Sequence, residues 1–591
     1  MDGFETEELE KLKGDHKMPF RELTGRTLHY VRPELLRFIL AGLLIITNVG
    51  IDVILPLFIE NIVASLGLAE IPIRHIITLV ILYFCVSMVN LLFFYAESML
   101  LQTAGQNIIY TLRMDIFSHI EEMSQNQFTE MPVGSLVTRV TSYTQSLSDL
   151  FTNVLVSVIR NFLTLIGVYS IMIYLSPRLS LFLLGPVVLV FISSFIFSRY
   201  IGKTFRAERK NLSELNSFMS ENLSGMRITQ IFNQEEKKLE EFDQKNNELR
   251  RSKFRSILGF GIYRPFITFI YMGSVALSFY VGIETGIAAA GIVAFYLYLS
   301  RFYNPIQALA DQVNNVQKAY TASERLFNLM DVKPEVRDLP DAVPLDNVKG
   351  KIEFRHVWFA YRGEDWILKD VSFVINPKQT CAFVGATGAG KTTILSLIVR
   401  NYEIQKGQIL IDDQDIAHIS IKSLRRCIGQ MLQDVTLFSG SIRTNINLHD
   451  ESFTEEEIRE ACEYVNATSF IDRLPKGLDE EVIERGENFS QGQRQLLSFA
   501  RTVLHRPQIL ILDEATANID TETEVLIQQS LEKIKNIGTM LVVAHRLSTI
   551  QHADQIIVLQ KGVVVERGTH QELLQQRGNY YKLYQLNMLD K

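Results

Sequence analysis

The sequence predicts an all-α six-helix transmembrane domain with long cytoplasmic helical extensions, followed by an α/β domain. The first half of the chain contains six long apolar stretches, whereas the second half alternates short strand-like runs with helical ones. Hydrophobic residues make up 47% of the chain and charged residues 21%, as expected when an apolar and a polar domain are joined. At 591 residues, the chain is also too long for a single hydrophobic core.

Each of the six apolar stretches is long enough to cross a membrane. A helix needs about 20 apolar residues to span roughly 30 Å of hydrocarbon. Runs such as 38–53 and 179–197 are too continuously apolar for amphipathic surface helices, and the same continuity disfavours the alternative of buried helices in a soluble protein. We expect spans at about 37–64, 75–101, 147–174, 179–199, 258–282 and 287–311.

Basic residues indicate the orientation, because Lys- and Arg-rich connections stay on the cytoplasmic side. The N-terminal segment and the fourth connection are basic, whereas 67–74 and 284–288 contain almost no basic residues. We therefore expect a multi-pass protein of the plasma membrane with both termini and the C-terminal domain in the cytoplasm. The segment 20–30 is amphipathic and is predicted to form a helix on the inner leaflet.

The second and fourth connections are long, contain few Pro or Gly residues, and include helix-forming runs such as 234–248. They are predicted to continue the spanning helices into the cytoplasm. About 20 helical residues project on the order of 30 Å, which is enough to reach a soluble domain below the membrane.

Composition shifts near 332–348, where Pro and Asp accumulate. We expect a transmembrane domain at 1–320, a linker at 321–348 and a second domain at 349–591. Within the second domain, runs such as 380–384 and 509–512 alternate with helical segments, a pattern typical of α/β domains built on a mainly parallel sheet.

Charge and cysteine usage exclude other classes. A net charge of −7 provides no basic field for nucleic acid, so no nucleic-acid partner is expected. Cys85, Cys381, Cys427 and Cys462 show no CxxC spacing, which predicts reduced thiols rather than disulfides or a zinc site.

A glycine-rich motif follows the strand-like run 381–384 and opens a helical run. Glycines let backbone N–H groups surround phosphates, a lysine ammonium binds the β- and γ-phosphates, and a threonine hydroxyl ligates Mg²⁺. The motif predicts ATP and Mg²⁺ as cofactors. The candidate nucleotide-binding residues are Gly385, Ala386, Thr387, Gly388, Ala389, Gly390, Lys391, Thr392 and Thr393.

Two carboxylates, Asp513 and Glu514, end the apolar run 509–512, at the kind of strand end where α/β sheets place ligands. Asp513 is expected to hold Mg²⁺ and Glu514 to orient or deprotonate the attacking water. Such a strand end is often only a solvated terminus, but the phosphate-binding motif favours the functional interpretation.

On these motifs the whole chain resembles the ABC transporter family. Tyr361 matches the family's adenine-stacking aromatic residue, Gln433 its Q-loop glutamine and His545 its switch histidine. The resemblance implies an ABC nucleotide-binding domain whose catalytic residues are Lys391, Gln433, Glu514 and His545, with Mg²⁺ held by Thr392, Gln433 and Asp513.

The family's signature motif, usually Leu-Ser-Gly-Gly-Gln, is present at 489–493 with two departures, and the D-loop at 517–520 also departs. In the family the signature caps ATP bound on a partner domain, so the resemblance implies that ATP is shared between two subunits. The residues implied to act there are Ser490, Gly492, Gln493 and Asp520.

Gln491 replaces the first glycine of the signature and adds a side chain where backbone approaches phosphate. Because Lys391 and Glu514 remain intact, the chain resembles the catalytic-glutamate subunit of a bacterial heterodimeric multidrug exporter, with a second ABC half-transporter that contributes a degenerate ATP site. The alternative is a homodimer that tolerates Gln491. The exporter resemblance also predicts short coupling helices near 127–135 and 211–221.

Five ionisable residues fall within or at the ends of the expected spans: Asp52, Glu60, Glu97, Arg160 and Asp311. Such groups tend to face a cavity or one another. An aromatic cavity with an occasional acid would suit amphipathic, often cationic compounds. The simpler alternative is that each group is satisfied by an interhelical partner.

The resulting hypothesis is ATP-hydrolysis-driven export of hydrophobic or amphipathic compounds, such as drugs and dyes, from the cytoplasm or inner leaflet by alternating access. The alternatives are a lipid or glycolipid flippase or a peptide exporter of the same fold, and, in a different class, an ATP-gated channel or a regulatory ATPase.

Overall fold

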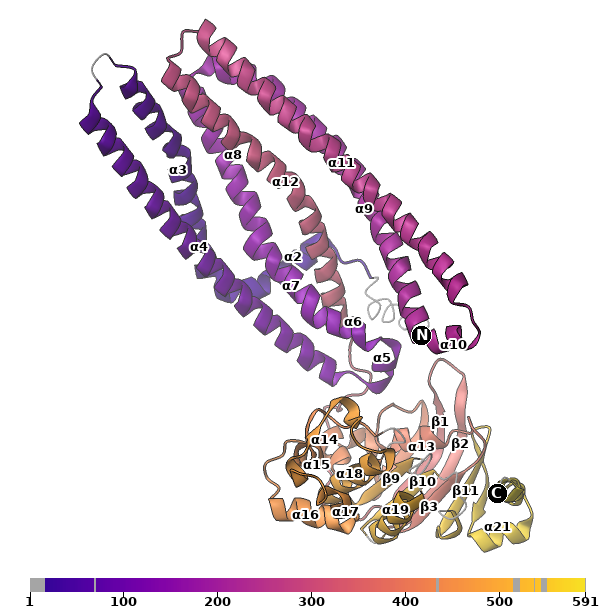
Figure 1. Ribbon diagram of the computed structural model, residues 1–591. Coiled ribbons are helices and arrows are strands. Elements are labelled where there is room, and N and C mark those ends of the chain that lie inside the picture. Colours follow the sequence, from indigo (N-terminus) through magenta and orange to yellow (C-terminus); the bar gives the residue numbers. More distant parts are fainter. Residues whose placement is uncertain are drawn as a thin grey trace. The chain divides into compact units, whose positions relative to one another are not determined.

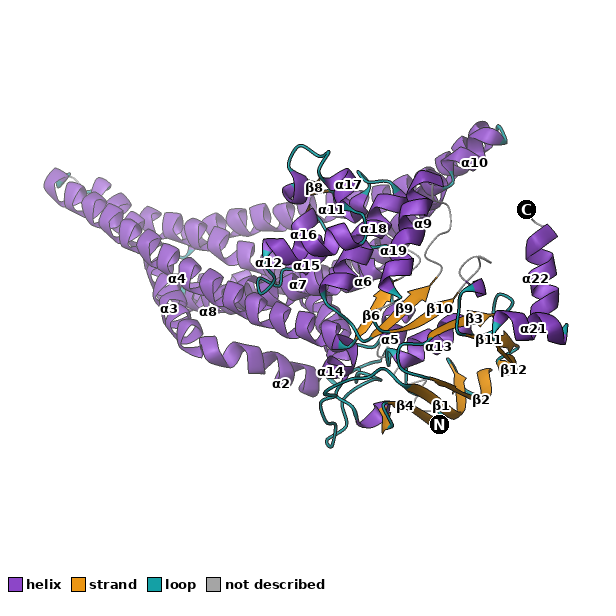
Figure 2. Ribbon diagram, turned by 90° about the horizontal axis from the view of Figure 1, so that it is seen from below, coloured by secondary structure: helices purple, strands orange, loops and turns teal. Residues whose placement is uncertain are grey.

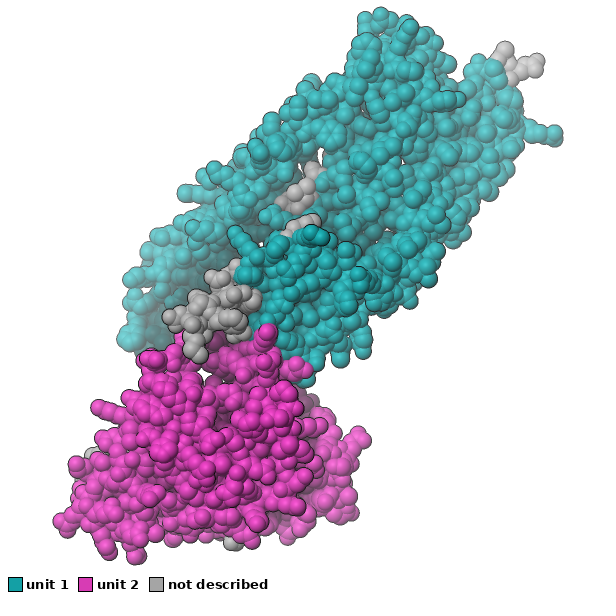
Figure 3. Space-filling view, turned by 180° about the vertical axis from the view of Figure 1, so that it is seen from behind, with its two compact units in different colours: residues 1–121, 131–332 teal, residues 122–130, 333–591 magenta. Residues whose placement is uncertain are grey.

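The structure is a computed structural model that describes residues 16–68, 71–431, 435–513, 521–535, 537–543 and 550–589, without the side chains of 20, 307, 310, 311, 313, 314, 521–524 and 586–589. The chain divides into two compact units (Figure 3). The first contains 1–121 and 131–332, and the second contains 122–130 and 333–591.

The first unit is built from helices, with no strand among its described residues (Figure 1). Its helices are α2 (Phe20–Val31), η1 (Arg32–Glu34), α3 (Leu35–Leu66), α4 (Ile73–Glu122), α6 (Val133–Thr138), η2 (Arg139–Tyr143), α7 (Thr144–Asp149), η3 (Leu150–Val154), α8 (Leu155–Leu175), α9 (Pro177–Ser224), α10 (Met226–Ile231), α11 (Glu235–Glu284) and α12 (Ala289–Met330). The short helix α5 (Gln125–Glu130) belongs to the second unit.

All six predicted spans coincide with helical segments to within two residues, and the prediction of a membrane domain made of long helices is confirmed. Within the described residues, five helical stretches are long and apolar enough to cross a membrane: 21–66, 73–122, 133–175, 177–224 and 235–284. They contain the first five predicted spans; the sixth, 287–311, lies in α12, which is not among them. Large apolar side chains on these helices face outward; Phe84 is 62% exposed and Leu91 59%. Monomeric soluble proteins rarely expose apolar surface on this scale, and lipid would cover it.

The long connections extend the spans as predicted, but the short helix predicted at 211–221 is not a separate element. Residues 211–221 are part of α9, because this stretch contains good helix formers and neither Gly nor Pro. The helix ends one turn later at Gly225, and the short helix that follows is α10 at Met226–Ile231. In the first connection, the short helix α5 overlaps the predicted range 127–135.

The amphipathic helix at the N-terminus is present as α2. This helix and the residues just before it form polar contacts with the C-terminal part of α12 and with Asp331 after it. Arg26 pairs with Asp331 at 2.6 Å, and the Met18 amide donates to Glu324 at 2.9 Å. Helix α12 ends at Met330, so the first ten residues of the range predicted as linker are helical.

The second unit is an α/β domain, as predicted. Its main sheet is six-stranded in the described residues, with the order β12-β11-β3-β10-β9-β6, parallel except for the edge strand β12 (Figure 2). An antiparallel sheet, β2-β1-β4-β5, and the pair β7-β8 accompany it. The elements are β1 (Ile352–Ala360), β2 (Trp366–Ile375), β3 (Thr380–Val384), α13 (Lys391–Ile398), β4 (Lys406–Ile411), β5 (Gln414–Asp415), η4 (Ile416–His418), α14 (Ile421–Arg426), β6 (Ile428–Met431), β7 (Gly440–Ser441), α15 (Ile442–Asn447), α16 (Glu455–Tyr464), α17 (Thr468–Ile471), η5 (Gly477–Asp479), β8 (Glu481–Val482), η6 (Glu484–Gly486), α18 (Gln491–Leu504), β9 (Ile509–Asp513), α19 (Thr521–Ile534), β10 (Thr539–Val543), β11 (Gln555–Gln560), β12 (Val563–Gly568), α21 (His570–Gln576) and α22 (Asn579–Leu589).

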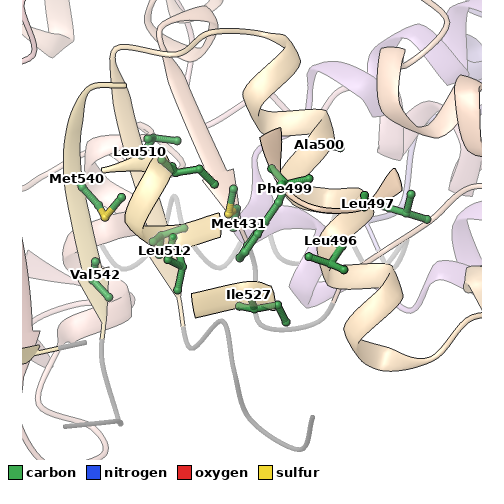
Figure 4. Close-up of a cluster of buried hydrophobic side chains, with 14 of the residues drawn as sticks. Met431, Leu496, Leu497, Phe499, Ala500, Leu510, Leu512, Ile527, Met540 and Val542 are labelled. Atoms are coloured by element: carbon green, nitrogen blue, oxygen red, sulfur yellow. The ribbon is translucent and has the colours of Figure 1, made fainter. Parts of the chain in front are cut away.

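Both faces of the parallel sheet are buried, which explains why its strands read as unbroken apolar runs. In β9, Leu510 and Leu512 face a cluster with Phe499 of α18 and Ile527 of α19 (Figure 4). Ile509 and Ile511 belong to the opposite cluster, together with side chains of α13. The helix that follows the phosphate-binding motif and the helix that follows the signature are therefore held on opposite faces of one sheet.

Candidate functional site

The carboxyl ends of three adjacent strands are level in the sheet. Val543 at the end of β10 pairs with Phe383 of β3 on one side and with Asp513 of β9 on the other. Neighbouring parallel strands lie about 4.8 Å apart, and β10 separates β3 from β9, so the ends of β3 and β9 are about 10 Å apart. The glycine-rich loop after β3 and Asp513 at the end of β9 therefore lie at the same edge of the sheet. This juxtaposition agrees with the expectation from the sequence.

The glycine-rich loop has a backbone that admits no side chain at two positions. A Cβ on Gly385 would lie 2.3 Å from the Leu559 carbonyl oxygen, and one on Gly390 would lie 2.6 Å from a Leu368 methyl. Gly390 also has a φ of 100° and forms the N-cap of α13. The loop thus turns tightly from strand to helix and presents the N–H groups at the start of α13, a natural anion site.

The lysine of the motif is folded back over this loop. Its Nζ donates to the carbonyl oxygens of Gly385 at 2.7 Å and Ala386 at 3.2 Å, and only 7% of the residue is exposed. The adjacent Thr392 and the loop residues 386–388 are exposed. A bound phosphate would therefore meet backbone N–H groups, the Lys391 ammonium and the Thr392 hydroxyl together.

Tyr361, the predicted adenine-stacking residue, is fixed beside the first turn of α13. Its hydroxyl and the Thr393 hydroxyl are 3.0 Å apart, and its ring makes an edge contact with Tyr402 at 5.1 Å. Burial, and secondarily Tyr361, raise the pKa of Tyr402. Sequence reasoning missed Tyr402, since a lone tyrosine beyond α13 carries no motif that would reveal this contact.

The signature residues form the start of α18. Ser490 is its N-cap: the Ser490 hydroxyl accepts from the Gln493 amide at 3.2 Å, and the Gln493 side chain accepts from the Ser490 amide at 3.0 Å. Phe489 is buried beside this cap, Gly492 is buried, and Gln491 is exposed. The Gln493 side chain therefore has a structural task in the cap, in addition to the role implied for it at the partner's ATP.

Four predicted site residues lie outside the described residues: Gln433, Glu514, Asp520 and His545. In the chain, Gln433 follows β6, Glu514 follows β9 and His545 follows β10, and these three strands are neighbours in the sheet. The described candidates for Mg²⁺, the Thr392 hydroxyl and the Asp513 carboxylate, are hard oxygen donors that suit this cation. No cluster of three or more His, Cys, Asp or Glu with metal-site geometry occurs among the described residues.

The short helix α5 is bonded to the start of the α/β domain. The buried Gln127 side chain donates to the Lys333 carbonyl oxygen at 2.8 Å, Asn126 donates to Glu335 at 3.1 Å, and Arg362 forms an ion pair with Glu130. Sequence reasoning placed a short helix here but could not name these partners.

Three of the five ionisable residues considered in the spans, Asp52, Glu97 and Arg160, have interhelical partners. Glu97, 1% exposed, pairs with Arg160 and accepts from Asn48 at 2.9 Å. Asp52 accepts from Asn90 at 3.0 Å and lies 3.7 Å from Arg301. The interhelical alternative weighed from the sequence therefore describes both acids, while the side chain of Asp311 lies outside the described residues.

All four cysteines are free in the structure. Cys381, Cys427 and Cys462 are buried, and burial raises the pKa of each thiol, to about 11 for Cys427 and about 12 for Cys462. These thiols are thus poor nucleophiles and poor metal ligands.

The fold and the site define a class: a multi-pass membrane protein that carries a phosphate-binding α/β ATPase domain. Residues 38–306 match the ABC transporter transmembrane region, and residues 368–517 match the ABC transporter domain. The chain therefore belongs to the ABC transporter family, as an exporter-type half-transporter whose ATPase is coupled to transport.

Similar proteins agree with this assignment. The chain is 38% identical over 526 residues to "Probable multidrug resistance ABC transporter ATP-binding/permease protein YheH" of Bacillus subtilis, covering 87% of this chain and 77% of that protein. It is 35% identical to an ATP-dependent lipid A-core flippase of Syntrophus aciditrophicus, covering 83% and 82%. A solved structure of a bacterial Atm1-family ABC exporter with ATP bound aligns with a TM-score of 0.77 at 25% identity, covering 94% of this chain and 98% of that one.

Proposed function

We propose that this chain is one half of a dimeric exporter in the plasma membrane that moves hydrophobic or amphipathic compounds, such as drugs and dyes, out of the cytoplasm or inner leaflet. The supporting observation is the phosphate-binding loop and Asp513 at one sheet edge, in a chain that also carries membrane-spanning helices. Similarity to proteins named for multidrug resistance and for lipid A-core flipping favours an amphipathic cargo.

The chain's own residues divide the work of hydrolysis. Lys391 and the glycine loop hold the phosphates, and Tyr361 stacks on the adenine. Glu514 orients the attacking water, because phosphoryl transfer depends mainly on positioning and charge compensation. Mg²⁺, when bound by Thr392, Gln433 and Asp513, supplies positive charge beside the phosphates.

Transport follows alternating access. Two ATP molecules join the cytoplasmic ATPase domains of the two subunits, and each signature loop completes the partner's site. The hydrogen bond of Gln127 to Lys333 and the ion pair of Glu130 with Arg362 tie helix α5 to the ATPase domain, so movement of that domain is carried into α5 and toward the spans. Hydrolysis at the Glu514 site resets the cycle.

The second subunit is a different ABC half-transporter whose own catalytic glutamate is substituted. The exposed Gln491 in the signature supports this, since it adds a side chain where a partner's phosphate would approach the α18 N-terminus. Purification of the chain alone tests the point. It should show weak ATPase activity that rises on addition of the second chain, whereas full ATPase and transport activity without any partner would establish the homodimer.

The cargo class is tested in proteoliposomes of the purified exporter. ATP-dependent uptake of an amphipathic dye is expected, with fluorescent lipid analogues transported more slowly. Faster movement of lipid than of dye would make the chain a flippase, and ion conductance without uptake would make it a channel.

A further inference from the structure

Tyr361, the residue proposed to stack on adenine, lies directly after strand β1, and 41% of it is exposed. An aromatic side chain that is free to rotate loses that freedom when a base stacks on it, which weakens binding. Contacts that fix the Tyr361 ring before ATP binds therefore contribute to the affinity for ATP.

Two aromatic rings and one hydroxyl hold Tyr361. The rings of Phe359 and Tyr402 make edge contacts with it, each at an interplanar angle of 83°, with centroid distances of 4.9 Å and 5.1 Å. Phe359 and Tyr402 also contact each other at 5.7 Å, so each of the three rings touches the other two. The Tyr361 hydroxyl lies 3.0 Å from the hydroxyl of Thr393 on α13. Edge-to-face contacts are a favoured geometry for aromatic pairs, so this arrangement stabilises one orientation of the Tyr361 ring.

Of the two neighbouring rings, only Phe359 belongs to the buried core. Phe359 is 2% exposed and lies within β1, whereas Tyr402 is half-buried at the margin of the same hydrophobic cluster, in the loop between α13 and β4. The Tyr402 hydroxyl forms no hydrogen bond with any residue that the structure describes. The ring of Tyr402, and not its hydroxyl, is therefore the part that contacts Tyr361.

The loop that carries Tyr402 is itself held in place. Glu403, the next residue, pairs with the fully buried Arg400 at 2.9 Å. The Gln405 side chain donates to the Ala360 carbonyl at 2.9 Å and accepts from the Ala360 amide at 3.0 Å, which ties the loop to the residue just before the stacking tyrosine. Tyr402 thus keeps a fixed place beside the ring that it contacts.

We propose that Tyr402 is a positioning residue for ATP binding, which holds the Tyr361 ring in the orientation on which adenine stacks. Tyr402 acts through Tyr361 and not by contact with the nucleotide. The inference rests on the proposed stacking role of Tyr361 and adds to the ATP site a residue that lies beyond the phosphate-binding motif. Because Lys391 and the glycine loop hold the phosphates, loss of Tyr402 weakens ATP binding without slowing phosphoryl transfer.

The test measures ATP hydrolysis by the full-length exporter, assembled with its partner chain in nanodiscs, and separates KM from kcat. Tyr402→Ala should raise KM for ATP about fivefold and leave kcat within about twofold of wild type. Tyr402→Phe keeps the ring and should retain the wild-type KM. Tyr464→Ala removes another half-buried tyrosine of the same domain, one whose hydroxyl donates to the Lys533 carbonyl, and as the matched control it should leave KM unchanged.

A double-mutant cycle measures whether Tyr402 acts through Tyr361. Tyr361→Ala should raise KM about tenfold, and adding Tyr402→Ala to it should cause no further rise, because no ring is left to orient. Independent, multiplying effects in the double variant would overturn the inference. So would an unchanged KM in Tyr402→Ala, an equal rise in Tyr464→Ala, or a Tyr402→Phe variant that behaves like Tyr402→Ala. An unchanged KM in Tyr361→Ala would instead refute the stacking role itself, which belongs to the proposed function.

Discussion

At the scale of single residues, the candidate ATP site is set by positions where no side chain fits. Gly385 and Gly390 lie so close to Leu559 and Leu368 that a Cβ would overlap them. Lys391 is meanwhile held over the loop by two carbonyl oxygens. The sequence motif predicts the tight turn, because Gly390 has a φ of 100°, a conformation that favours glycine. The contacts with Leu559 and Leu368 depend on tertiary packing. The contact of Tyr361 with Tyr402 could not be predicted, because it depends on tertiary packing.

The first prediction concerns Ser490, the N-cap of α18. Ser490→Ala removes the hydroxyl that accepts from the Gln493 amide and should lower the free energy of unfolding of the ATPase domain by about 1 kcal/mol. Ser490→Asp keeps a capping oxygen and should restore that stability, yet it places a negative charge where the partner's γ-phosphate would approach. Its ATPase activity at the shared site should therefore fall well below that of wild type.

Chemical denaturation and steady-state ATPase assays on the assembled dimer measure the two effects. If Ser490→Asp is both stable and fully active, Ser490 serves the helix alone.

The second prediction concerns the buried cysteines. With pKa values of about 11 and 12, Cys427 and Cys462 are almost entirely protonated at pH 8, and thiolate is the reactive form. Maleimide should therefore leave both unmodified in the folded protein at pH 8, and modification should appear only on denaturation. Peptide mass spectrometry after labelling measures this, with the same protein labelled after denaturation as the comparison. Rapid native labelling of Cys427 would show that the turn between α14 and β6 opens readily.

At the scale of elements, the long helices were predictable and the short ones only in part. Long continuous apolar runs predict the spans. Shorter continuous apolar runs predict the buried parallel strands β9 and β10. The short helix α10 was misplaced, because the helix-forming residues 211–221 continue α9 and Gly225 ends it later than expected. Helix α5 was anticipated, but its hydrogen bonds to Lys333 and Glu335 could not be predicted, because they join residues far apart in the chain.

The third prediction tests α5 as the element that links hydrolysis to transport. Gln127→Leu removes the donor to the Lys333 carbonyl and leaves that carbonyl without this partner. We expect ATPase activity within about threefold of wild type but a drop of roughly tenfold in cargo moved per ATP, equivalent to about 1.4 kcal/mol of lost coupling. Dye uptake and phosphate release, measured on the same proteoliposomes, give the ratio. Thr129→Ala, on the same helix, should behave as wild type because its hydroxyl only donates to a carbonyl within that helix. An unchanged ratio in Gln127→Leu would remove α5 from the coupling path.

At the scale of the whole molecule, the sequence predicts the two-domain plan because the two halves differ in composition. The first half has the long apolar runs expected of helices in lipid, and the second has the alternating strands and helices expected of a domain in water. The hydrogen bond of Arg301 on α12 to a backbone carbonyl of α3 could not be predicted from the sequence, although one signal was present, a lone arginine four residues before Pro305 in an apolar run. Its pairing with the Asp52 carbonyl depends on Pro56 in a helix at the other end of the domain's sequence. The assembly of two subunits around shared ATP follows from the signature motif and not from any contact within one chain.

The central claim is that ATP turnover directed by Glu514 drives transport. The most direct measurement is ATP-dependent dye uptake by proteoliposomes of the Glu514→Gln exporter, with ATP binding measured in parallel. Wild-type ATP affinity, with hydrolysis and uptake reduced about 100-fold or more, is the predicted result. Hydrolysis and uptake at the wild-type rate in this variant would contradict the account, because another group would then position the attacking water.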